Sequence, residues 1–116
     1  MTRFVKHRDA KDMREHGRII LAHGEVTGHV HEVCAVATGD TLPAAEFFEE
    51  PDGRRVLLLL RPCVLRHQEH GPIALDPAAP VQVRQGDLLL NPIGAGAWLV
   101  IRQREYAPDA IRNVVD

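Results

Sequence analysis

Two pairs of histidines, far apart in the sequence, have the residue type and spacing best suited to chemistry in this chain. The first pair is His29 and His31, and the second is His67 and His70. Side chains at i and i+2 project from the same face of a strand, so the first pair would point the same way. Imidazole nitrogens are common ligands of transition metals. The spacing therefore predicts a divalent transition-metal site with these four ligands, for which zinc, iron, nickel and manganese all stay open.

The stretch that follows His67 decides whether the second pair can join the first. Residues three apart face opposite sides of a straight strand, but Gly71-Pro72 favours a turn, in which His67 and His70 can face the same way. Glu69 lies between them and is the candidate for a catalytic role. It could ligate the metal, orient a histidine or act as a general base. The alternative is that these histidines are surface residues in contact with water.

The chain also contains three other histidines and two cysteines, residue types that could serve the same site. His23 ends the preceding apolar run and is a further candidate ligand, whereas His7 and His16 fall in a polar N-terminal segment and are excluded. Cys34 and Cys63 form no C-x-x-C motif. We interpret both as buried thiols, with soft metal ligation as the alternative.

Composition indicates one globular domain. The chain has 116 residues, of which 45% are hydrophobic. Residues 1–17 are polar and of mixed charge, which predicts a flexible arm or a short surface helix, and residues 18–116 form a single β domain.

The net charge of −2 does not favour nucleic acid. The longest apolar run, Val56–Leu60, is too short to span a membrane, and no signal-peptide stretch precedes it. We expect a soluble, cytoplasmic protein.

Short strands separated by glycine and proline turns predict an all-β fold. The expected strands cover residues 18–22, 29–37, 45–49, 55–60, 81–84, 88–90 and 97–103, with turns at 38–40, 50–53, 85–87 and 91–94. No helix-length amphipathic pattern interrupts them, so an α/β parallel sheet is disfavoured. A small barrel or a β-sandwich fits this pattern.

Residues 86–97 resemble the second sequence motif of the cupin superfamily. The two glycines and the proline of that motif are present, but Ala97 stands at the position of its histidine. His29-Val-His31 is similar to the core of the first cupin motif, although the glutamate that follows there is absent. The resemblance implies a small cupin-like barrel in which His67 or His70 replaces the missing histidine.

A second resemblance is to a small uncharacterised family of bacterial and phage proteins. Its motifs are Gly-His-x-His, His-x-Glu-His-Gly-Pro-Ile and Arg-Gln-Arg-Glu-Tyr, which correspond here to Gly28–His31, His67–Ile73 and Arg102–Tyr106. The likeness spans residues 18–116. It implies a shared architecture and histidine pattern, and it implies no activity.

Other side chains suggest contacts rather than catalysis. Phe47 and Phe48 are adjacent, so one ring should face outward, where it could mark a contact with a second copy of the chain. Trp98 is predicted in the core. Arg102 or Arg104 could bind an anion or a partner, or could pair with local acids.

Three functions remain open on this evidence. The first is metal binding, with metal-dependent chemistry on a small-molecule ligand as its enzymatic form. The second is a non-catalytic interaction or homodimerising domain of a phage or prophage accessory kind. The third, a nucleic-acid module using the basic residues of the arm, is disfavoured because acidic residues alternate with them.

Overall fold

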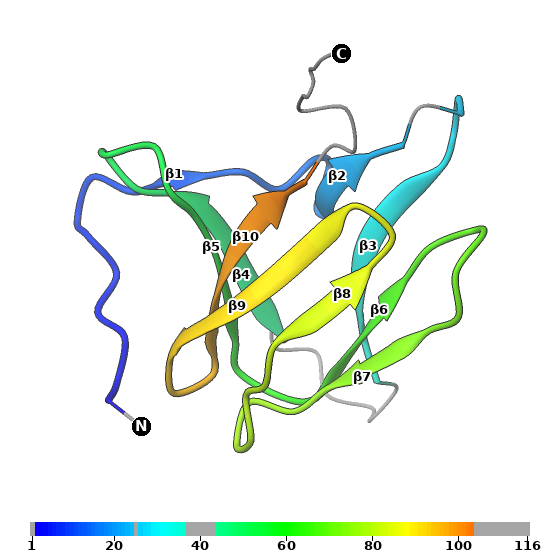
Figure 1. The fold of residues 1–116 in the computed structure, drawn as a ribbon. Helices are drawn as coiled ribbons and strands as arrows, with labels where there is room; N and C mark the ends of the chain where they lie inside the picture. Colours follow the sequence, from blue (N-terminus) through cyan, green and yellow to red (C-terminus); the bar gives the residue numbers. More distant parts are fainter. Residues whose placement is uncertain (1, 25, 37–43, 104–116) are drawn as a thin grey trace, which may run out of the picture.

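Two antiparallel β-sheets make up the computed structural model, which describes residues 2–24, 26–36 and 44–103 (Figure 1). The six-stranded sheet has the order β1-β4-β5-β10-β9-β8, and the four-stranded sheet has the order β2-β3-β6-β7. The first sheet contains β1 (Lys11–Asp12), β4 (Ala45–Glu49), β5 (Arg55–Leu59), β8 (Val83–Gln85), β9 (Leu88–Gly94) and β10 (Ala97–Arg102). The second contains β2 (Ile19–His23), β3 (Val30–Ala35), β6 (Cys63–Arg66) and β7 (Ile73–Leu75).

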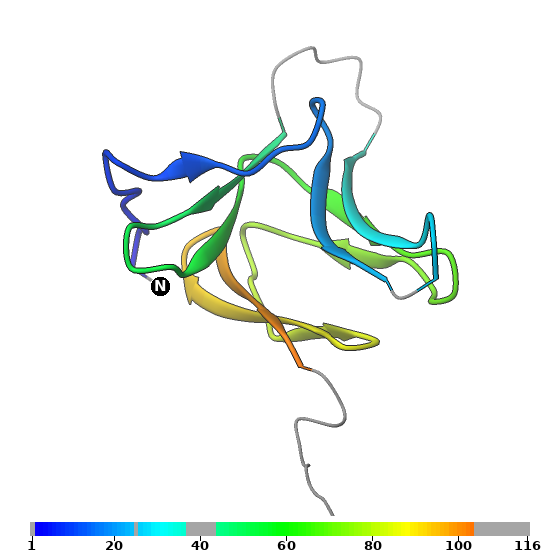
Figure 2. The same cartoon turned by 90° about the horizontal axis from the view of Figure 1, so that it is seen from above.

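The hydrophobic core lies between the two sheets. Leu57 and Leu90 of the larger sheet and Leu65 of the smaller sheet have no exposed surface. Trp98 is 1% exposed, as predicted, and its Nε1 donates a 2.8 Å hydrogen bond to the carbonyl of Val81. Seen from above, the sheets lie on opposite sides of this core (Figure 2). Alternating apolar side chains on each sheet thus meet in one layer, as in a sandwich.

The all-β prediction is confirmed, and of its two forms the structure is the sandwich. Within the described ranges, no strand is paired with strands of both sheets, so the sheets are not closed into a barrel. The β4–β5 hairpin has the predicted strands, with Ala45 opposite Leu59 and Glu49 opposite Arg55. Gly53 in its turn has φ +92°, a conformation that glycine adopts without strain.

Strand β9 is longer than predicted. A turn was expected at 91–94, yet β9 continues to Gly94, with Trp98 of β10 opposite Pro92. β8 pairs only with Leu88–Leu90, so Pro92 lies beyond the end of β8, next to a register shift in the β9–β10 pairing. Proline lacks an N–H and is tolerated at such an edge or bulge. The prediction was wrong because the position of Pro92 beyond the end of β8 depends on how distant strands pair in the folded sheet, which the local sequence does not show.

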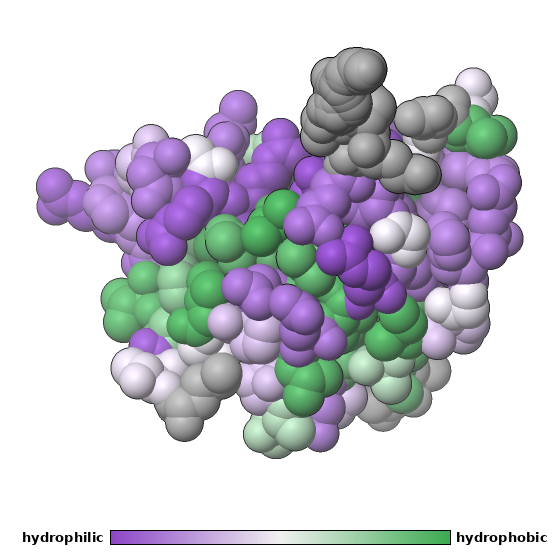
Figure 3. All heavy atoms as spheres, in the orientation of Figure 1, coloured by the Kyte–Doolittle hydropathy of each residue, from purple (hydrophilic) through white to green (hydrophobic). Residues whose placement is uncertain are grey.

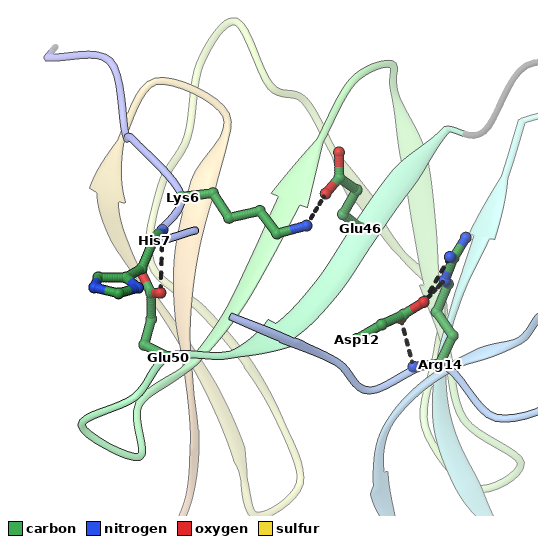
Figure 4. A network of polar contacts seen from close by, with 6 residues as sticks. All are labelled: Lys6, His7, Asp12, Arg14, Glu46 and Glu50. Carbon is green, nitrogen blue, oxygen red and sulfur yellow. Dashed lines mark hydrogen bonds and ion pairs between the residues drawn. The ribbon is translucent and has the colours of Figure 1, made fainter. Parts of the chain in front are cut away.

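The N-terminal arm lies along the larger sheet, and its described part contains no helix. Strand β1 pairs with β4, and the carbonyl of Thr2 accepts a hydrogen bond from the N–H of Ala95. Lys6 pairs with Glu46 at 3.0 Å, and the N–H of His7 donates to the Glu50 carboxylate (Figure 4). The arm is therefore attached to the sheet at several points.

The attached arm corrects the prediction that one of the two adjacent phenylalanines is exposed. Phe47 and Phe48 are 2% and 1% exposed. The Phe4 ring lies 6.1 Å from that of Phe48, and Lys6 Nζ lies 4.9 Å from the same ring. Phe48 does face away from the core, but the arm covers it. Its ring is thus not available for contact with a second copy.

The outer surface mixes polar and apolar residues. On the face shown in Figure 3, hydrophobic residues form a band across the middle, with hydrophilic residues above it. No helix in the described part of the chain has the length and apolarity needed to cross a membrane.

Candidate functional site

Strand β3 directs its histidine toward the space between the sheets. Side chains alternate along a strand, so His31 and Val33 face the core and Glu32 faces outward. His31 is 2% exposed, while Glu32 forms a two-point ion pair with Arg18 on the outer face. The predicted alternation is observed from His31 to Val33, whereas Val30 is also buried and Ala35 is exposed.

The structure brings the four predicted histidines side by side. We call His29, His31, His67 and His70 the histidine group. His31 lies in β3 and His29 immediately precedes that strand, and the other two come from the segment that joins β6 to β7. The ring centres of His67 lie 4.3 Å from His31, 4.8 Å from His70 and 5.8 Å from His29. His67 and His70 face the same way, as a turn permits.

Gln85 fixes the proton of the buried histidine. The Gln85 amide nitrogen donates to the carbonyls of Leu65 (3.2 Å) and Gly71 (3.0 Å), so its oxygen must be the atom that faces His31 Nδ1 at 2.8 Å. An oxygen there can only accept, so Nδ1 carries the proton. In the neutral ring, the lone pair of His31 is consequently on Nε2.

Asp87 lies on the other side of the same ring. Its Oδ1 is 3.4 Å from His31 Nε2, and its Oδ2 accepts a 2.8 Å hydrogen bond from Arg102 Nε. The pKa of the Asp87 carboxyl lies below its usual value. Burial alone would raise this pKa, but the hydrogen bond and charge of Arg102, together with His31, lower it by more than burial raises it. Arg102 therefore pairs locally, one of its two predicted alternatives, and Arg104 lies outside the described residues.

The other histidines present their nitrogens differently. His29 Nδ1 lies 3.3 Å from Glu69 Oε2, a contact that suits an Nδ1–H and leaves Nε2 free. His67 Nδ1 instead accepts a 3.0 Å hydrogen bond from the N–H of Glu69, so the proton of neutral His67 is on Nε2. Glu69 thus contacts two members of the histidine group.

The environment of His67 favours the neutral ring. Burial lowers the pKa of His67, and the nearby His31, His70 and His29 lower it further, against a smaller opposing effect of Glu69. A positive charge on the His67 ring would be repelled by positive charge on the neighbouring imidazoles. Neutral imidazole is the form that binds metals.

His70 lies against the turn between β8 and β9. A Cβ built on Gly86 would be 2.7 Å from His70 Nε2, so only glycine lets the ring lie there. Gly86 also has φ +60°, which a two-residue hairpin turn needs. The ring planes of His70 and His31 are 13° apart, with centres separated by 6.3 Å.

The remaining candidates lie apart from this site. His23 is exposed and forms an ion pair with Glu15 at 3.0 Å, while Cys63 is buried and Cys34 is half-buried. Burial is also the main cause of the raised pKa values of both thiols. The prediction of a buried thiol is confirmed for Cys63, but Cys34 is only partly buried. In the ranges that the structure describes, no three His, Cys, Asp or Glu side chains already surround a common point as metal ligands.

A cavity of about 660 Å³ occupies another part of the molecule. It is lined by residues of β2 and β10, including His23 and Leu99, and none of its lining residues belongs to the histidine group. Among the candidate ligands that the structure describes, His23 alone lines this cavity.

Gln85 and Asp87 are candidate site residues that the sequence patterns did not indicate, because both fall in a predicted turn. One signal was available for Gln85. It follows Val83 at i+2, so both share the core-facing side of β8, where a polar side chain needs a partner. No comparable signal existed for Asp87, because charged residues are common in turns.

Comparison with known proteins gives a family and no activity. A family model described as a domain of unknown function (DUF8820) matches residues 2–78. The match includes the arm and the whole histidine group, and it ends before Gln85 and Asp87. No curated protein and no solved structure is significantly similar to the chain.

Proposed function

Because this chain belongs to the DUF8820 family, a domain of unknown function, we propose its role from its own side chains: it binds a divalent transition metal through the histidine group. The observation that carries the proposal is the meeting of four imidazoles from two distant segments, in which the His67 ring lies 4.3 to 5.8 Å from the other three. Two imidazoles on one metal have ring centres about 5 Å apart. The ring separations in the histidine group, 4.3 to 6.3 Å, bracket that distance.

The nitrogens of the group support an order among the ligands. An oxygen lies next to Nδ1 in both His29 and His31, from Glu69 and Gln85 respectively. This is the usual arrangement of metal-bound histidines, and it leaves Nε2 to bind the metal. His70 would be the third ligand. His67 would bind only after losing its hydrogen bond with Glu69, or it would remain a neutral neighbour.

Metal binding requires local adjustment. His70 and Glu69 are exposed in the segment joining β6 to β7, so their side chains can rotate toward a shared ion at small cost. Nitrogen-rich ligation favours zinc, iron, nickel or manganese over magnesium and calcium. An open coordination position would permit chemistry on a small molecule, with Glu69 as the base.

The test is metal analysis of protein purified without an affinity tag, followed by titration of the metal-free protein with zinc. We expect about one metal per chain, and binding that is lost in the double variant His29→Ala/His31→Ala. His23→Ala is the matched control, because His23 is an exposed histidine outside the group and should leave binding unchanged. Protein that holds no metal, and whose zinc titration is the same with and without His29 and His31, would refute the proposal.

A second candidate function is a non-catalytic interaction domain. In that case the ring contacts and the His31–Gln85 hydrogen bond would serve only to hold the two sheets together. Light scattering of wild-type protein without metal distinguishes the homodimeric form of this candidate, since a strict monomer at high concentration excludes it. The arm does not favour nucleic acid, because Lys6 and Arg14 are engaged with Glu46 and Asp12.

A further inference from the structure

Gln85 at the end of β8 and Asp87 in the turn after it both lie next to His31. A role for them in the site rests on the proposed metal binding and extends it. We propose that Asp87 is a ligand of the same metal as His31, and that Gln85 is a positioning residue that presents Nε2 of His31 to that metal. Neither residue lies in the segment matched by the family model. The metal would consequently bridge the four-stranded sheet, through β3, and the six-stranded sheet, through the turn after β8.

The role of Gln85 follows from its three hydrogen bonds. Turning its amide over would place an oxygen against the carbonyls of Leu65 and Gly71 and would lose both donors at a buried site. The oxygen is therefore held against His31 Nδ1, and the proton with it. A histidine fixed in this way offers Nε2 to a metal without first moving a proton between its nitrogens.

The role of Asp87 follows from its distance to that nitrogen. Asp87 Oδ1 and His31 Nε2 are 3.4 Å apart, longer than the usual direct hydrogen bond. Two ligands at about 2.1 Å from a tetrahedral ion are separated by about 3.4 Å. Arg102 holds Oδ2 at 2.8 Å and thereby keeps Oδ1 turned toward His31.

The first measurement reads the His31 proton in metal-free protein by long-range ¹H–¹⁵N NMR. We expect the proton on Nδ1 in the wild type and on Nε2, next to Asp87, in Gln85→Leu. Gln85→Met keeps the length of the side chain without its amide, so it should give the same pattern as Gln85→Leu, and it serves if the leucine variant does not fold. A wild-type ring protonated on Nε2 and not on Nδ1 would overturn the assignment to Gln85.

The second measurement is zinc affinity by calorimetric titration of the full chain. Asp87→Asn should weaken binding at least about tenfold, and Gln85→Leu about 10- to 100-fold. Arg102→Gln keeps the carboxylate but loses the contact that orients it, so it should weaken zinc binding less than Asp87→Asn does. Gln82→Leu is the matched control for Gln85, because Gln82 is an exposed glutamine of the same segment.

The outcomes separate this inference from the proposed function. If wild-type protein is purified without metal and binds no zinc, the proposed function fails and the ligand role of Asp87 fails with it. If wild-type protein binds zinc and Asp87→Asn binds it equally well, metal binding stands and the inference is overturned. Equal losses in Asp87→Asn and Arg102→Gln would also overturn it, since they would show that only the ion pair matters.

Discussion

His70 Nε2 lies 2.7 Å from the position that a Cβ on Gly86 would occupy, so the identity of a turn residue controls where a candidate ligand can lie. Gly86→Ala should displace the His70 ring and also strain the turn, because alanine at φ +60° costs about 1–2 kcal/mol. His70 is exposed and can rotate away, so most of the loss of stability should come from the backbone.

Gly53→Ala is the control for that variant. Gly53 also has positive φ, but apart from its chain neighbours no atom of the described residues lies within 4 Å of its Cβ position. Urea unfolding should show similar losses for both variants, whereas NMR signals of the His70 ring should shift only in Gly86→Ala. Unchanged His70 signals in Gly86→Ala would contradict the predicted displacement.

The arm should contribute to stability through Phe4. Phe4→Ala uncovers Phe48, and the lost aromatic contact and apolar burial should lower the free energy of unfolding by about 1–2 kcal/mol. Val5→Ala is the matched control, since Val5 is 78% exposed and its truncation should change stability by less than about 0.5 kcal/mol. Equal stability of the two variants in urea would show that the arm does not cover Phe48 in solution.

The carboxyl of Asp12 should titrate well below its normal range. Hydrogen bonds from the side chain and backbone N–H of Arg14 lower the pKa of Asp12 from 3.8 to about 2 (Figure 4). A lowered folded-state pKa adds stability above the unfolded value, and that stability is lost as the pH falls from about 4 to about 2. The gain is at most about 1 kcal/mol, because the pair is exposed.

An NMR titration of the Asp12 carboxyl provides the measurement. The midpoint should be near pH 2 in the wild type and should rise toward 3.8 in Arg14→Gln. Asp52 offers an internal comparison in the same spectra, because its partner Arg54 is untouched. A wild-type midpoint near 3.8 would mean that the Arg14 contact does not persist in solution.

The stability of the fold should be sensitive to substitution of Trp98. Trp98→Phe removes the hydrogen bond to the Val81 carbonyl and leaves a small void, which together should cost about 1–3 kcal/mol. Val81→Ala keeps that carbonyl and truncates an exposed side chain, so it should be nearly neutral. Heat or urea unfolding followed by circular dichroism compares the variants, and a neutral Trp98→Phe would contradict the packing described.

The sequence predicted local features that depend on neighbouring residues. The β4–β5 hairpin followed from Glu50–Gly53, and the core-facing side of β3 followed from its alternation. The same alternation placed His29 and His31 on one face, and Gly71-Pro72 predicted the turn that lets His67 and His70 face together. Each of these inferences needs only the geometry of a short segment.

Features that depend on long-range contacts were not predictable. Phe48 follows Phe47 in a strand, so one of the two rings was expected to be exposed. The Phe48 ring does face outward, but Phe4 of the arm, more than 40 residues earlier in the sequence, covers it. The extension of β9 through Pro92 depended on where β8 ends. Asp87 is an ordinary turn residue until β3 brings His31 to within 3.4 Å of it.

By itself the sequence determined an all-strand chain with four histidines in two short segments, because side-chain periodicity and turn chemistry are local. Only the tertiary structure decided that the sheets form a sandwich and not a barrel, and that Gln85 and Asp87 flank the buried histidine. The physical reason is that sheet edges, covering segments and buried hydrogen bonds are fixed by contacts between residues distant in the chain, which local patterns do not specify.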